Sequence, residues 1–98
     1  MVRRSVMSEY ISIDAEYGDD PDEVCLHTNL RLAQGAPESY ANREEGDVGS
    51  PLAQTLFGID GLEALQISGG MLTVRRAAET EWHTLIDEIS IALKDFFL

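Results

Sequence analysis

The sequence has a single cysteine, no long apolar run and no secretory signal. One thiol, Cys25, excludes a disulfide framework, and it excludes any zinc or iron–sulfur site that needs several thiolates from this chain alone. No apolar run approaches the ~20 residues that a helix needs to span a bilayer. The start, Met1 to Met7, has two arginines but no apolar stretch after them, unlike a secretory signal. These absences predict a cytoplasmic protein.

Basic residues are also scarce. Seven lysines and arginines stand against 18 aspartates and glutamates, which gives a net charge of −11. This charge excludes nucleic acid and anionic membrane as expected partners, because both would be repelled. A length of 98 residues, 44% of them hydrophobic, is enough for one domain with one modest core. We expect residues 1–9 to be flexible.

Alternating apolar and polar residues predict two β-hairpins. The first pairs 11–16 with 24–32 across an aspartate-rich turn, and the second pairs 62–68 with 71–75. Gly69-Gly70 supplies the positive φ angles that a two-residue hairpin needs. The residues expected to face the core are Ile11, Ile13, Ala15, Val24, Leu26, Leu30, Leu32, Leu65, Ile67, Leu72 and Val74.

Two helices are predicted. Ser50-Pro51 has the capping serine and first-turn proline of a short helix. A longer helix begins at Glu79 or Thr80, and its apolar stripe recurs at helical spacing. The stripe comprises Trp82, Leu85, Ile86, Ile89, Leu93, Phe96 and Phe97. Residues 33–49 show no sustained period and predict a long acidic loop, with an extended segment near Tyr40 as the alternative left open.

These elements follow one another in the order ββαββα. They predict an α+β, two-layer sandwich in which a four-stranded, mostly antiparallel sheet carries two helices on one face. The other face of the sheet would meet solvent or a partner.

Cys25 and His27 are two residues apart on a predicted strand, so both are expected on this outer face. A thiolate and an imidazole are soft metal ligands, but a dedicated site needs three or four ligands. The alternative is a strand whose outward residues happen to include both types. The turn Asp19 to Glu23 gathers four carboxylates, which suit a hard cation, but an acidic solvated hairpin turn is the favoured explanation.

The remaining polar residues do not form a catalytic constellation. His83 is expected opposite the apolar stripe of the last helix, as an exposed residue. Ser50 lacks a nucleophile elbow and is explained by capping. We therefore expect no enzymatic activity.

Several short motifs give the chain a family resemblance. Ser50-Pro-Leu-Ala53 and Leu56-Phe57-Gly-Ile-Asp-Gly-Leu62 are followed in order by Met71-Leu-Thr-Val74, Glu81-Trp82 and Leu93-Lys-Asp-Phe-Phe97. This series resembles the N-terminal domain of Nfu/NifU-like iron–sulfur scaffold proteins. Asp20-Pro21-Asp22 stands where that family typically has Asn-Pro-Asn.

The resemblance implies the α+β fold and a link to iron–sulfur cluster assembly. In this family a separate C-terminal domain carries the cluster through a Cys-x-x-Cys motif, and the present chain ends before such a motif. A free-standing N-terminal domain with one cysteine is therefore not expected to hold a cluster in that way.

Three hypotheses follow. The first is a non-catalytic accessory module of iron–sulfur metabolism that binds another protein, such as a scaffold or carrier with a basic patch. The second is a domain that binds iron or another divalent metal through the 19–27 hairpin, with Asp20, Asp22, Cys25 and His27 as ligands. The third is a diverged structural domain unrelated to iron. The first and third hypotheses require no cofactor, the second requires iron or another divalent metal, and the oligomeric state stays open.

Overall fold

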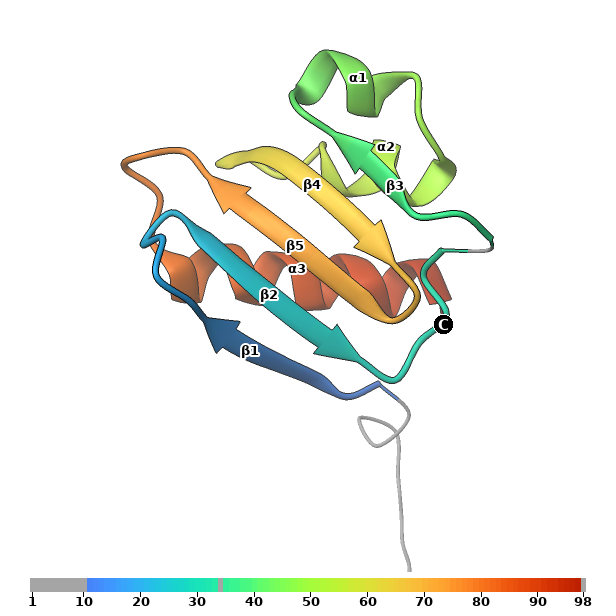
Figure 1. The fold of residues 1–98 in the computed structure, drawn as a ribbon, viewed down its shortest axis with the longest axis horizontal. Helices are drawn as coiled ribbons and strands as arrows, with labels where there is room; N and C mark the ends of the chain where they lie inside the picture. Colours follow the sequence, from blue (N-terminus) through green and yellow to red (C-terminus); the bar gives the residue numbers. More distant parts are fainter. Residues whose placement is uncertain (1–10, 34, 98) are drawn as a thin grey trace, which may run out of the picture.

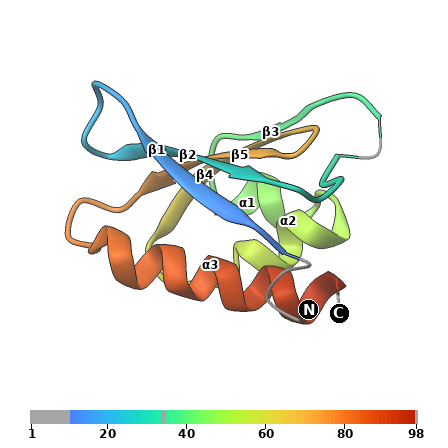
Figure 2. The ribbon, with the colours of Figure 1, turned by 90° about the horizontal axis from the view of Figure 1, so that it is seen from below.

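A computed structural model describes residues 11–33 and 35–97, which form an α+β sandwich of two layers. A sheet forms one layer, and the long helix α3 runs beneath it (Figure 1). Seen from the side, the helices lie on one side of the sheet, and no helix of the described residues covers the other side (Figure 2). The elements are β1 (Ile13–Tyr17), β2 (Glu23–Thr28), β3 (Glu38–Tyr40), α1 (Arg43–Asp47), α2 (Pro51–Leu56), β4 (Leu62–Ser68), β5 (Met71–Arg76) and α3 (Trp82–Phe97).

The sheet has the strand order β1-β2-β5-β4-β3, and every neighbouring pair is antiparallel. The pairs β1–β2 and β4–β5 are the two predicted hairpins. Gly69, with a φ of +58°, provides the positive backbone angle that joins β4 to β5. The hairpins meet where Leu26 of β2 lies opposite Leu72 of β5. This pairing places β5 in the middle of the sheet.

The core lies between the sheet and the helices. Leu26, Leu72 and Val74 contribute the buried face of the central strands, and Leu85, Ile89 and Leu93 contribute that of α3. Burying an aliphatic side chain of this size contributes ~1.5–3 kcal/mol before the entropy cost of ordering it. The predicted stripe of α3 is therefore confirmed at its centre.

The predicted number of elements is too small. Within residues 11–33 and 35–97, five strands and three helices replace the predicted four and two. The predicted loop 33–49 contains both additional elements, β3 and α1. Strand β3 pairs with β4, with Tyr40 opposite Leu65, so its partner lies far away in the sequence.

Local hydrogen bonds explain why α1 forms in this acidic segment. The Asn42 side chain caps the helix by accepting a hydrogen bond from the Glu45 amide at 2.9 Å. The Glu45 carboxylate accepts in turn from the Ala41 amide at 2.8 Å, which completes a reciprocal cap. The Tyr40 ring then meets the buried Phe57 ring edge to face, with centroids 6.2 Å apart.

Smaller predictions at the element ends are also corrected. The second strand ends at Thr28 and not at Leu32, because the Thr28 hydroxyl donates to the Gly70 carbonyl and turns the chain. Ala15 is exposed because β1 is an edge strand with β2 as its one paired neighbour. Helix α3 begins at Trp82, and Phe96 is 41% exposed in its last turn. The predicted flexible residues 1–9 lie outside the described part.

Candidate functional site

The bare face of the sheet carries the polar residues singled out in the sequence. Within 11–33 and 35–97, the helices lie on the opposite side (Figure 2). The register places Cys25 opposite Thr73 and His27 opposite Met71, so these four side chains share the bare face. The predicted common face for Cys25 and His27 is confirmed. We call this surface, built on β1, β2, β5 and β4, the open face.

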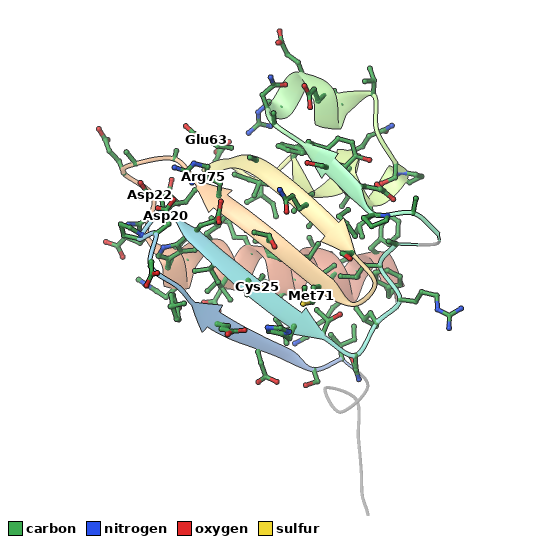
Figure 3. The ribbon with its side chains drawn as sticks, in the orientation of Figure 1. Asp20, Asp22, Cys25, Glu63, Met71 and Arg75 are labelled. Atoms are coloured by element: carbon green, nitrogen blue, oxygen red, sulfur yellow. The ribbon has the colours of Figure 1, made fainter. Side chains whose placement is uncertain are left out.

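Sulfur atoms from two strands meet at the centre of the open face. The Cys25 thiol Sγ lies 3.9 Å from the Met71 thioether Sδ, as a weak S–H···S contact (Figure 3). Cys25 is half-buried, whereas Met71 is 38% exposed. On the other side of Cys25, the His27 Nε2 lies 2.6 Å from a carboxylate oxygen of Glu16 on β1.

The aspartate-rich turn is held by an arginine at one end of the open face. Arg75 Nη1 donates to Asp20 Oδ2 at 2.9 Å and to Glu23 Oε2 at 3.4 Å. Asp20 Oδ1 also accepts from the Asp22 amide at 2.9 Å. This backbone hydrogen bond and the Arg75 guanidinium lower the pKa of Asp20, and the same carboxylate raises the pKa of Arg75.

A second arginine ties the same turn to the beginning of α3. Arg76 Nε donates to Asp22 Oδ1 at 3.2 Å, and its guanidinium lies 5.2 Å from the ring centroid of Trp82. The Trp82 indole Nε1 donates to the Pro21 carbonyl at 2.8 Å. The carboxylates of Asp20 and Asp22 are thus bound to cations of the protein itself.

The four predicted metal ligands do not converge. Figure 3 shows Asp20 and Asp22 beside Arg75, and Cys25 beside Met71 further along the sheet. Among the described residues, no group of three or more His, Cys, Asp or Glu side chains is placed to hold a metal ion. Iron binding by Asp20, Asp22, Cys25 and His27 stays a prediction.

Three shallow hollows lie on or beside the open face. One of about 260 Å³ lies between the turn and β2, and Cys25 and Thr73 form part of its wall. Hollows of about 490 Å³ and about 150 Å³ lie toward β4 and β3, and Arg75 lines both. Arg75 therefore borders two of these hollows at its end of the open face.

The other sequence candidates have structural roles or lie elsewhere. Ser50 Oγ accepts from the Ala53 amide at 3.2 Å, which confirms it as a helix cap. The exposed His83 lies at the beginning of α3, 3.4 Å from Glu81, in the helical layer. Within the described ranges, we find no helix with the length and apolarity to cross a membrane.

Comparison with known proteins identifies the family. The model of the family described as scaffold protein Nfu/NifU N terminal matches residues 9–98. The chain belongs to the Nfu/NifU N-terminal family. The resemblance read from the motifs of the second half is therefore confirmed.

A curated protein matches part of this Nfu N-terminal domain in sequence. A NifU-like protein of Schizosaccharomyces pombe, C1709.19c, is 43% identical over 47 residues, which cover 48% of this chain and 18% of that protein. The present chain thus spans about a fifth of that curated relative.

Solved structures show the same fold at low identity. The crystal structure of Staphylococcus aureus SAV1430 has a TM-score of 0.67 and 10% identity, and the match covers 83% of this chain and 96% of that one. The solution structure of Staphylococcus epidermidis SeR13 has a TM-score of 0.54 and 11% identity, covering 84% and 93%.

Sequence reasoning about this Nfu N-terminal domain missed Glu16, Met71 and Arg75. The strand period placed Met71 and Arg75 on the same face of their own hairpin. It did not reveal that β5 pairs with β2, and only that pairing brings Met71 next to Cys25. Glu16 lies opposite Cys25 within the first hairpin. The register of that hairpin was therefore the signal that could have placed Glu16 next to this site.

Proposed function

We propose that this Nfu N-terminal domain is a non-catalytic, cytoplasmic interaction module of iron–sulfur cluster assembly. In this proposal, the open face docks a partner protein that presents a basic patch. The proposal rests on one observation above all, which is that no helix of the described residues covers the open face. Family membership and the NifU-like relative support the link to iron–sulfur cluster assembly.

The composition of the open face suits a protein interface. Its centre holds the half-buried Cys25, the partly exposed Met71 and Thr73. Exposed carboxylates, Asp14 and Glu16, stand toward the β1 edge. Interfaces commonly combine an apolar centre containing Met with a charged rim.

The charge of the domain favours a basic partner. A net charge of −11 accelerates encounters with a positive surface, and salt weakens this attraction. We expect the association rate to fall as the salt concentration rises. An association rate that is equal at low and high salt would count against a basic partner.

Site-directed photo-crosslinking tests where the partner docks. A photoreactive phenylalanine analogue replaces Thr73 on the open face, or Glu88 on the exposed side of α3 as the matched control. After irradiation in cells, mass spectrometry identifies the crosslinked proteins. We expect iron–sulfur assembly proteins from position 73 and not from position 88. Capture of such proteins from position 88 alone would disprove docking on the open face.

Charge reversal tests the same docking by kinetics. Asp14→Lys and Asp87→Lys each change the net charge from −11 to −9, but Asp14 lies on the open face and Asp87 lies on α3. With the captured partner, Asp14→Lys is expected to slow association severalfold more than Asp87→Lys. Equal effects would mean that only the total charge matters, and not this face.

The arrangement does not favour metal binding by the turn as a second function. Arg75 and Arg76 already neutralise Asp20 and Asp22, so a cation would have to displace both.

A further inference from the structure

We propose that Cys25, Met71 and His27 form a binding site for a soft monovalent metal ion, Cu(I). The site lies at the centre of the open face and does not depend on the proposed docking function. It uses a thioether, a ligand type outside the four metal ligands predicted from the sequence. It also differs in chemistry from the divalent site expected at the hairpin.

The distance between the two sulfur atoms fits a single bound ion. Cys25 Sγ and Met71 Sδ are 3.9 Å apart, and they come from adjacent strands of a rigid central pair. Two metal–sulfur bonds of ~2.3 Å, the length seen for thiolates on zinc, place their sulfurs ~4.0 Å apart at a trigonal angle of 120°. An ion between these sulfurs would therefore need little movement of the backbone.

His27, which lies opposite Met71 on the open face, is the third ligand in this proposal. Its Nε2 is engaged by Glu16 at 2.6 Å, and an imidazole that donates from Nε2 keeps its lone pair on Nδ1. Metal-bound histidines commonly donate their other ring nitrogen to a carboxylate in this way. Because His27 lies directly opposite Met71, the Cβ atoms of the two residues are expected ~5 Å apart.

The ligand set selects Cu(I) over the divalent ions. Thiolate and thioether ligands prefer Cu(I), whereas Fe(II) and Zn(II) at structural sites need more ligands or harder ones. Nearby carboxylates that would suit a harder ion are occupied, since Asp20 and Glu23 are bound to Arg75 and Glu16 to His27. A low coordination number also suits a half-exposed sheet surface.

Anaerobic titration with Cu(I) against bicinchoninate, a chromogenic competitor, tests the site on the full chain. The variants are Cys25→Ser, Met71→Leu and His27→Gln, and the control Thr73→Val changes a neighbour of Cys25 while leaving all three ligands in place. We expect one Cu(I) per chain, and an affinity for Cu(I) at least tenfold lower in Cys25→Ser and in Met71→Leu. His27→Gln is expected to lower the affinity severalfold, and Thr73→Val is expected to bind as the parent chain does.

A second measurement reports the site directly. The NMR signal of the Met71 methyl group should shift on addition of one equivalent of Ag(I), a redox-inert analogue of Cu(I), and it should not shift in the Cys25→Ser variant. Circular dichroism confirms that each variant is folded. Binding that survives Met71→Leu, a Met71 signal that does not respond, or Zn(II) displacing Cu(I) at one equivalent would each overturn the proposal.

Discussion

Gly46 is the residue at which a single added carbon has the clearest consequence. A Cβ at this position would fall within the ring of Phe57, which is fully buried. The ring has no room to move, because buried side chains are packed at crystal-like density. Gly46→Ala is expected to lower the free energy of unfolding by ~1–3 kcal/mol, as overpacking usually does.

Urea denaturation followed by Trp82 fluorescence measures this loss. Gly18→Ala is the matched control, since a Cβ there meets nothing within 4 Å. A loss of stability in both variants would indicate a general effect of replacing glycine with alanine, and not overpacking at Phe57.

Asp20 makes folding sensitive to acid. Its pKa is lowered from 3.8 by the Asp22 amide and by Arg75, so its stabilising contribution is present above pH 3.8 and is lost as the pH falls through the lowered value. Arg75→Gln should raise the pKa of Asp20 toward 3.8 without reaching it, because the Asp22 amide remains. Carboxyl-carbon NMR titration measures the change, and Asp20→Asn identifies the signal. An unchanged pKa in Arg75→Gln would show that the backbone hydrogen bond acts alone.

At the scale of elements, α1 depends on its cap. Asn42→Ala removes the side chain that accepts from the Glu45 amide, and loss of such a cap costs ~0.5–2 kcal/mol. Hydrogen exchange should then become faster in the α1 segment and in β3, which precedes it, and less so in β5. Ser39→Ala, on the exposed position of β3, serves as the control. Uniformly faster exchange across the sheet would contradict a local role.

The elements that the sequence predicts correctly are those whose hydrophobic pattern is sustained over many residues or is bounded by a distinctive turn. Helix α3 was predicted because its stripe spans several turns, and the β4–β5 hairpin because Gly69-Gly70 separates two alternating runs. Strand β3 has three residues, too few to show a period, and its partner β4 lies beyond two helices. Helix α1 is short and acidic, so side-chain capping decides its structure.

The same limit applies to the open face. The period of two correctly placed Cys25 and His27 on one side of β2. Met71 and Arg75 lie on the neighbouring strand β5. Their position next to β2 depends on how the two hairpins pair with each other, which the tertiary structure decides. The arginine partners of the turn were missed for this reason, and so the carboxylates of the turn looked freer in the sequence than they are.

At the scale of the whole molecule, charge opposes compactness. A net charge of −11 is confined within a radius of gyration of 13.3 Å, so most acidic groups lie closer together than the Debye length of ~30 Å at 10 mM salt. At 150 mM salt that length falls to ~8 Å, and much of the repulsion is screened. We expect the melting temperature to rise by ~4–8 °C between these salt concentrations, which corresponds to about 1 kcal/mol for a domain of this size.

Differential scanning calorimetry in sodium chloride measures this rise, and Asp87→Lys provides the comparison. The variant lowers the net charge to −9 from an exposed position on α3. It should melt higher than the parent chain at 10 mM salt and gain less from added salt. A melting temperature that falls with salt would mean instead that the attractive pairs, Arg75 with Asp20 and Arg76 with Asp22, outweigh the general repulsion. A melting temperature that rises with salt would thus show that repulsion within the acidic surface destabilises the fold, a cost tolerated for binding. One that falls would show that local ion pairs stabilise it.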